Sequence, residues 1–129
     1  MMIDQYVGLP FAEDGRGPDR YDCWGLVKRV LEKEFGLAGL PNYLGVESVG
    51  DAIALAKSSR TWRASSSPRR GAVVVMLTDG VPEHVGVMVD DRNVLHVDRR
   101  MAAVCVPITH PSVAGRIESF WLHADLRSA

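Results

Sequence analysis

The apolar pattern of this chain changes once along its length, near Gly71, from the period of a helix to short β-branched runs. Before the change, apolar side chains between residues 23 and 35 recur at steps of three and four, which predicts an amphipathic helix. Asp22 is a suitable N-cap for this helix, and Gly36 can follow its last turn. Helices that precede strands favour an α+β domain, in which a small antiparallel sheet packs against the N-terminal helices.

A second, shorter helix is predicted over residues 49–57, where Ser48 and Asp51 have a spacing close to that of a capping box. Residues 58–70 are polar and rich in serine, so we expect a mobile connection there. Residues 6–21 contain several Gly and Pro without an apolar period, which indicates an irregular but ordered segment before the first helix.

Beyond Gly71, five short runs rich in Val, Ile and other apolar residues are separated by clusters of Gly, Pro, Asp and Asn. Such runs are typical of strands, because β-branched side chains pack well on a pleated surface. The predicted strands cover residues 72–77, 85–89, 94–97, 104–106 and 117–123.

The length of 129 residues fits one domain, and we take residues 1–129 as a single unit. The formal net charge is -1, so we expect no nucleic-acid partner. No window approaches the roughly 20 apolar residues of a membrane span, and the first residues lack the features of a signal peptide. We therefore expect no membrane association and a cytoplasmic location during synthesis, in which Cys23 and Cys105 remain free thiols.

Cys23 stands at the start of the first predicted helix, which is a suitable place for a reactive thiol. The positive end of a helix dipole favours the thiolate, and we expect it to lower the thiol pKa from about 8.5 toward neutrality. The alternative is that Cys23 is a small buried apolar residue without a chemical role.

His84 and His96 are candidates for the base and its orienting partner, which acyl transfer by a thiol requires. They lie twelve positions apart on two predicted neighbouring strands, so the loop length decides whether they share a face of the sheet. With two or four loop residues, His96 lies opposite Val87 on the wrong face. With three or five residues, or with a bulge, it lies opposite Gly86 or Met88 on the face of His84.

A catalytic role therefore predicts an odd loop or a bulge near residues 90–93, with Asp or Asn in a left-handed conformation. Asp98 is the reserve candidate for the orienting group. A metal site made by Cys23, His84 and His96 is an alternative, but the chain lacks the short Cys or His spacings of such sites. We expect no metal and no cofactor.

Three further residues are predicted to have structural roles only. His110 and His123 are expected to be packed or solvated imidazoles, and Cys105 alternates with valines as a packing residue of a strand.

Taken together, these residues resemble the NlpC-type, papain-like family of cell-wall cysteine peptidases. The resemblance covers residues 6–97, about three quarters of the chain. It is carried in order by Tyr6-Val7-Gly8, Asp22-Cys23-Trp24-Gly25-Leu26-Val27, Gly71-Ala72-Val73-Val74, His84-Val85-Gly86-Val87 and His96.

The resemblance implies a papain-like catalytic domain with Cys23 as nucleophile, His84 as general base and His96 as the orienting residue. Tyr6 and the backbone N–H of Cys23 would hold the oxyanion. Asp22 and Trp24 join Tyr6 as candidate oxyanion or substrate residues, although we assign Asp22 to helix capping. The implied reaction is hydrolysis of peptidoglycan stem peptides, between D-glutamate and diaminopimelate, through a thioester acyl-enzyme.

Two departures from the wall-peptidase pattern are visible. Trp24 replaces the usual Ser after the cysteine, and we expect no cell-wall-binding domain, so that anchoring would come from a tail partner. A lesser change is Ala72 in place of the Asp of a Gly-Asp pair. With Gly15-Arg16 and Leu40-Pro41-Asn42-Tyr43, the chain is more similar to the tail-assembly branch of long-tailed phages. This resemblance implies a phage or prophage tail protein with tail-protein partners and a place in the virion tail. The alternatives are a non-enzymatic tail-assembly component that keeps the fold and, more remotely, an amidase or acyltransferase.

Overall fold

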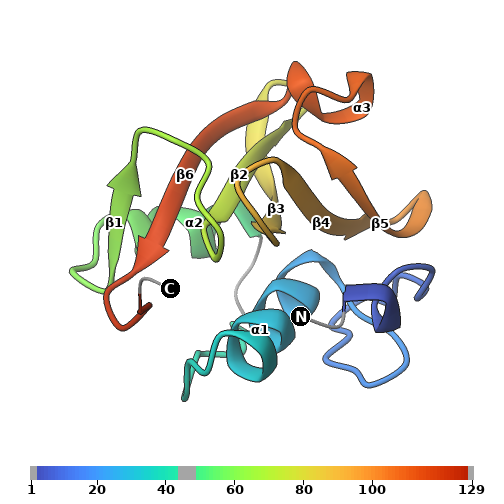
Figure 1. The fold of residues 1–129 in the computed structure, drawn as a ribbon, viewed down its shortest axis with the longest axis horizontal. Helices are drawn as coiled ribbons and strands as arrows, with labels where there is room; N and C mark the ends of the chain where they lie inside the picture. Colours follow the sequence, from blue (N-terminus) through green and yellow to red (C-terminus); the bar gives the residue numbers. More distant parts are fainter. Residues whose placement is uncertain (1–2, 44–48, 128–129) are drawn as a thin grey trace.

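Six antiparallel strands form one sheet in the computed structural model, which describes residues 3–43 and 49–127. The strand order is β1-β6-β2-β3-β4-β5, and Figure 1 shows helix α1 and the N-terminal segment together on one side of the sheet. The predicted α+β class with an antiparallel sheet is confirmed. The strands are β1 Trp62–Ser65, β2 Val73–Thr78, β3 Val81–Met88, β4 Asn93–Asp98, β5 Met101–Pro107 and β6 Ile117–His123.

The first predicted helix is present as α1, Cys23–Glu34. Asp22 is its N-cap, with the side chain accepting a hydrogen bond from the backbone N–H of Gly25 at 2.7 Å. Phe35 is the C-cap, and Gly36 follows with a φ of 72°, a left-handed conformation that glycine adopts readily. Both ends of the helix therefore agree with the sequence prediction.

The second predicted helix is α2, Val49–Lys57, with the predicted bounds. Ser48, predicted to cap it, lies outside the described residues. Two short elements were not predicted from the sequence. They are the 3₁₀ helix η1, Ile3–Gln5, and the one-turn helix α3, Pro111–Ala114.

The prediction of a polar connection over residues 58–70 is wrong in part, because it contains the strand β1. This strand pairs with β6 at the edge of the sheet, and only Trp62 among its four residues is buried. One buried side chain leaves no alternating pattern in the sequence, so the pairing comes from backbone hydrogen bonds with β6.

The sheet separates two groups of buried side chains. Val73, Val75, Val85, Val87 and Leu95 pack with α1 in the larger cluster. The alternate positions on the same strands carry most of the smaller cluster, with Val74, Met76, Met88 and Val94, and Val113 of α3 joins it. Because side chains alternate along a strand, the two clusters lie on opposite faces of the sheet.

The β3–β4 hairpin has the register that the catalytic hypothesis predicts. Val87 pairs with Leu95 and Met88 with Val94, and the N–H of Val89 donates to the carbonyl of Asn93 at 3.0 Å. Three residues, 90–92, therefore form the loop, and the register extended by one residue places His96 opposite Gly86. The odd loop is confirmed.

The expected left-handed Asp or Asn in this loop is wrong. Among the described residues, the non-glycine positions with positive φ are Asp14, Tyr43 and Asp79. The loop is held instead by the Asp90 carboxylate, which accepts hydrogen bonds from the backbone N–H groups of Arg92 and Asn93 at 2.7 Å each. A side-chain acceptor of this kind closes a turn without a left-handed residue.

Across residues 3–43 and 49–127, no helix combines the length and the apolar character that a bilayer crossing requires.

Candidate active site

The hairpin brings the two candidate imidazoles into contact. His84 Nε2 and His96 Nδ1 are 2.9 Å apart, and the ring planes meet at 71°. Both side chains are buried, with His96 fully inaccessible. Since Nε2 of His84 faces His96, its Nδ1 is the ring atom left for another partner. This arrangement suits a base oriented by a second histidine.

Burial keeps both imidazoles neutral. It lowers the pKa of His84 to about 3, with further lowering by His96 and Arg116, whereas Asp98 raises it. For His96, burial again dominates and lowers the pKa to about 4, with Asp98 acting in the opposite direction. A neutral His84 has the correct protonation state to accept a proton.

Cys23 lies at the first position of α1 and packs in the larger cluster, with 6% of its surface exposed. The backbone N–H groups of Val85, Trp24 and Cys23 itself favour the thiolate. The sulfur is therefore placed beside the amide of the residue that follows His84. Within the described residues, however, no hydrogen bond joins the sulfur to the His84 ring.

The expected lowering of the Cys23 pKa is wrong. Burial raises the pKa of the thiol to about 11, and the nearby Asp22 carboxylate raises it further, against the lowering by the three amides. Desolvation penalises the charged thiolate, and here it outweighs the N-terminal amides of the helix. The thiol is accordingly protonated at neutral pH.

Asp22 has the capping role assigned to it from the sequence, and it has a second partner. Its Oδ1 accepts a hydrogen bond from Arg16 at 2.7 Å in addition to the one from Gly25. Arg16 also donates to the backbone carbonyls of Gly15 and Asn42. One arginine thus ties the loop before α1 to the segment that follows it.

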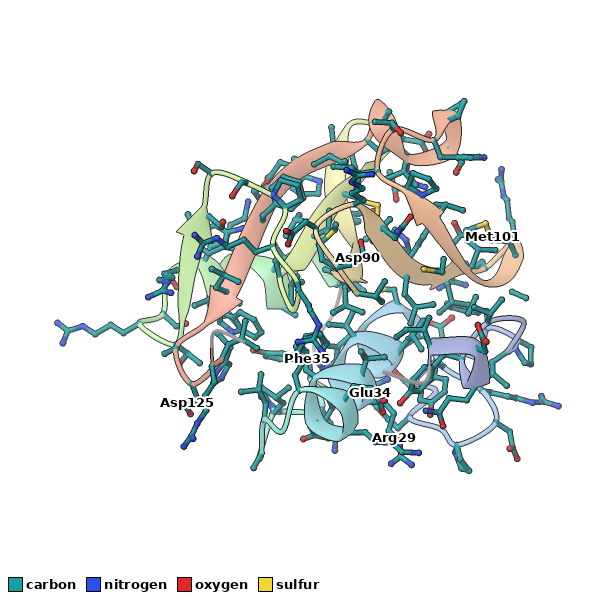
Figure 2. All side chains as sticks on the ribbon, viewed as in Figure 1. Arg29, Glu34, Phe35, Asp90, Met101 and Asp125 are labelled. Atoms are coloured by element: carbon teal, nitrogen blue, oxygen red, sulfur yellow. The ribbon has the colours of Figure 1, made fainter. Side chains whose placement is uncertain are left out.

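Tyr6 is not placed as an oxyanion donor. Its hydroxyl donates to Glu34 Oε2 at 3.1 Å, and Glu34, labelled in Figure 2, is the last residue of α1 whereas Cys23 is the first. A helix of this length separates its two ends by roughly 16 Å. Burial and the Glu34 carboxylate raise the pKa of Tyr6 well above its usual value. The Tyr6 hydroxyl therefore lies at the opposite end of α1 from Cys23, away from the predicted oxyanion site.

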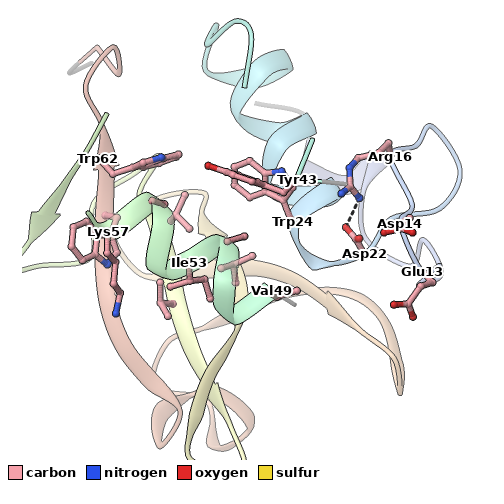
Figure 3. Close-up of a pocket in the computed structure, with 16 residues that line it drawn as sticks. Glu13, Asp14, Arg16, Asp22, Trp24, Tyr43, Val49, Ile53, Lys57 and Trp62 are labelled. Carbon is pink, nitrogen blue, oxygen red and sulfur yellow. Dashed lines mark hydrogen bonds and ion pairs between the residues drawn. The ribbon is translucent and has the colours of Figure 1, made fainter. Parts of the chain in front are cut away.

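Trp24 forms part of an aromatic wall. Its indole N–H donates to the carbonyl of Pro41 at 2.9 Å, and its ring contacts Tyr43 and Trp62 edge to face. The wall belongs to a cavity of about 160 Å³ (Figure 3), with the Arg16–Asp22 pair at one end and Lys57 at the other. Trp24 and Asp22 are the predicted site residues that line it.

Cys23, His84 and His96 are not among the described residues that line this cavity. Three neighbours of Cys23 do line the cavity. Asp22 and Trp24 flank Cys23 in the sequence, and the backbone amide of Val85 contacts its sulfur. Cys23 itself is therefore not part of the lining, although residues next to it are.

A model of the NlpC/P60 family matches residues 8–119. The chain belongs to the NlpC/P60 family.

Two solved structures share the fold of this NlpC/P60 domain. The NlpC/p60 domain of the peptidoglycan hydrolase SagA superposes with a TM-score of 0.61 at 17% identity, covering 92% of this chain and 90% of that one. A lipoprotein-like NLP/P60 protein from Staphylococcus aureus superposes with a TM-score of 0.62 at 16% identity, covering 96% of this chain and 39% of that one. No curated protein matches the chain in sequence. At these identities the two structures support the fold.

Two contributors to the site in this NlpC/P60 domain were missed as functional residues. Arg16 belongs to the Gly15-Arg16 motif that resembles the phage tail-assembly branch. Its contact with Asp22 depends on the path of the loop before α1, which the sequence does not define. The Val85 amide is a backbone group, so its position beside the sulfur leaves no signal in the residue type.

The residues expected to be structural have structural contacts. His110 is the N-cap of α3, and its Nδ1 accepts from the N–H of Ser112. His123 packs edge to face on Trp62 at 5.0 Å between ring centroids. Cys105 is a half-buried thiol beside the larger cluster.

Proposed function

We propose that this NlpC/P60 domain is a cysteine peptidase that hydrolyses the peptide stems of peptidoglycan. Cys23 is the nucleophile, His84 the general base and then acid, and His96 the residue that orients His84. The observation that carries the proposal is the buried His84–His96 pair, in which His84 uses Nε2 and keeps Nδ1 for another partner. His84 directly precedes Val85, whose backbone amide lies at the Cys23 sulfur. No cofactor is part of the mechanism.

The chemistry follows from the neutral state of the Cys23 thiol and the His84 imidazole. As the sulfur attacks the carbonyl carbon of the scissile amide, the thiol proton passes to His84 Nδ1, and His84 then donates it to the leaving amine. This leaves a thioester, which water hydrolyses with His84 acting as base again. The sulfur and Nδ1 must move into hydrogen-bond contact for this step, and such contacts often tighten only when substrate binds.

Backbone amides at the start of α1 are the proposed oxyanion donors in place of Tyr6. The N–H groups of Cys23 and Trp24 already point toward the sulfur. In related catalytic arrangements a preset donor of this kind contributes about 2.7–4 kcal/mol to the transition state.

The cavity beside Trp24 is proposed to bind the acyl part of the stem peptide. Its aromatic wall suits short apolar side chains, and Arg16, Asp22 and Lys57 supply charges at its ends. The similar SagA domain belongs to a protein named as a peptidoglycan hydrolase, which supports this substrate class. The narrower assignments, a D-glutamyl–diaminopimelate bond and a role in a phage tail with tail-protein partners, rest on the sequence resemblance alone.

Mass spectrometry of muropeptides tests the proposal. Wild type incubated with purified peptidoglycan should release stem fragments whose masses name the scissile bond. Cys23→Ala should release none while keeping its melting temperature within a few degrees, and Cys105→Ala should retain activity. Products from Cys23→Ala equal to those from wild type would exclude Cys23 as the nucleophile.

A non-enzymatic tail-assembly component is the second candidate. It is favoured by the burial of Cys23, by its raised pKa, and by the lack of a hydrogen bond to His84 among the described residues. In that case wild type and Cys23→Ala should be equally inactive on every peptidoglycan tested.

A further inference from the structure

We propose that His84, His96 and Asp98 form an inhibitory binding site for a divalent transition-metal ion of the zinc class. One potential ligand atom from each of these three residues lies within 4.8 Å of the other two. Two imidazoles and one carboxylate are a donor set that suits such ions. Metal binding stands on this geometry alone, whereas the inhibition rests on the proposed function.

The β3–β4 register and a local irregularity of β4 create this cluster. The three-residue loop aligns His84 and His96 on one face of the sheet. The pairing of β4 with β5 then shifts between His96 and Asp98, where Asp98 pairs with Met101. Asp98 is partly exposed while both rings are buried, so the site is open to solvent on the side of Asp98.

The ring positions are compatible with a metal ion between them. Metal–nitrogen bonds of about 2.0–2.1 Å at a tetrahedral angle place the two nitrogens roughly 3.3 Å apart and the ring centroids roughly 5 Å apart. The observed values are 2.9 Å between His84 Nε2 and His96 Nδ1 and 5.1 Å between centroids. The rings therefore need to tilt in place, with little translation, to exchange their hydrogen bond for two bonds to a metal.

The charges around the cluster are mixed. Both imidazoles are buried, and Asp98 supplies a negative charge beside them. Arg116 opposes a cation electrostatically, but its guanidinium is engaged by the carbonyl of Leu77 and by Thr78. The Asp98 carboxylate accepts from the backbone N–H of Arg100 and keeps a second oxygen for a metal.

A metal on His84 Nε2 would stop the proposed reaction by a change of tautomer. A neutral imidazole that binds a metal through Nε2 carries its proton on Nδ1. That nitrogen then cannot accept the thiol proton of Cys23. No covalent bond is altered, so removal of the ion by a chelator restores the base.

Binding is measured first, without reference to activity. The full chain with both thiols removed, Cys23→Ala with Cys105→Ala, is titrated with Zn²⁺ by calorimetry and with Co²⁺ by visible absorption. We expect one ion per chain, a d–d absorption band and a rise in melting temperature that EDTA reverses. The added substitution Asp98→Asn should weaken binding at least tenfold, whereas His110→Asn, which alters an exposed histidine elsewhere, should leave it unchanged.

Three results would overturn the site: no binding of either ion, binding that survives both Asp98→Asn and His96→Asn, or binding lost in His110→Asn. Asp98→Asn keeps the test decisive if His96→Asn fails to fold. The inhibition is tested separately on wild type, where Zn²⁺ should abolish muropeptide release and EDTA should restore it. An inactive wild type that still binds one ion through Asp98 refutes the proposed function and leaves the metal site standing.

Discussion

At the residue scale, Cys23 is subject to two opposing effects. The two amides of Cys23 and Trp24 at the start of α1 and the Val85 amide of β3 favour the thiolate, while burial disfavours any charge on the sulfur. Burial prevails, because an almost fully enclosed sulfur loses nearly all solvation by water. In the proposed mechanism such a thiol reacts with a neutral histidine as its base, without a preformed ion pair.

The pH dependence of Cys23 alkylation follows from this. In a Cys105→Ala background, iodoacetamide should react slowly at pH 7, where a thiol of pKa about 11 is ionised in about one molecule in ten thousand. The rate should rise about tenfold per pH unit up to pH 9.5, with circular dichroism used to verify folding. A rate that is already at a plateau at pH 7 would contradict the buried, neutral thiol.

Asp22 is a second residue whose substitution separates two effects. Asp22→Ala removes both the cap on Gly25 and the partner of Arg16, and should lower the free energy of unfolding by about 1–2 kcal/mol. Asp22→Asn keeps a capping oxygen and should lose less. Urea denaturation of both variants measures the difference, and equal losses would mean that the cap contributes nothing.

At the element scale, the β3–β4 hairpin determines the relative position of His84 and His96. Its three-residue loop sets the register that places His96 across from Gly86 and beside His84. There is no room for a side chain at Gly86, because an added Cβ would lie 2.8 Å from Val94 Cγ2 and 3.1 Å from His96 Cβ. Glycine at this position is therefore what lets the His96 side chain pack against β3.

Gly86→Ala should accordingly cost about 1–3 kcal/mol in the free energy of unfolding, the usual range for overpacking a core. It should also reduce muropeptide release by displacing His96. Gly115→Ala is the matched control, since its added Cβ meets nothing within 4 Å and its φ is -81°. Chemical denaturation of the two variants is the measurement, and similar stability in both would show that the Gly86 contact relaxes freely.

At the scale of the whole molecule, the fold buries the imidazoles of His84 and His96. In the folded protein the pKa is about 3 for His84 and about 4 for His96, so both rings stay neutral at any higher pH. An unfolded histidine binds a proton near pH 6.5. Below pH 6.5 the unfolded chain thus binds more protons than the folded one. Stability must fall as the pH falls through this range.

Between pH 7 and pH 5.5 we expect a loss of about 1 kcal/mol for each of the two histidines. This window lies above the range in which unfolded carboxyl groups titrate, so the histidines dominate it. Urea midpoints measured across the window should decrease for wild type and for His110→Asn, and should change less for His84→Gln. A constant midpoint for wild type would contradict neutral burial of the pair.

Much of the framework could be predicted from the sequence, because the relevant signals are local. The apolar period defined α1 and α2, Asp22 marked the start of α1, and parity linked the loop at residues 90–92 to the placement of His96. The strand β1 escaped prediction because its single buried residue, Trp62, forms no pattern. Tyr6 was misassigned because its hydroxyl partner, Glu34, is 28 positions away in sequence.

What the sequence determined by itself was therefore the order and type of most elements, the dependence of the His96 position on the loop length of one hairpin, and the family to which these patterns point. The tertiary structure alone decided the burial and the hydrogen-bond partners of the site residues. It raises the pKa of the Cys23 thiol, keeps His84 and His96 neutral, and holds Tyr6 at the end of α1 opposite to Cys23. The physical reason is that periodicity and capping act between near neighbours in the chain. Burial and hydrogen-bond partners depend on segments brought together only by the complete fold.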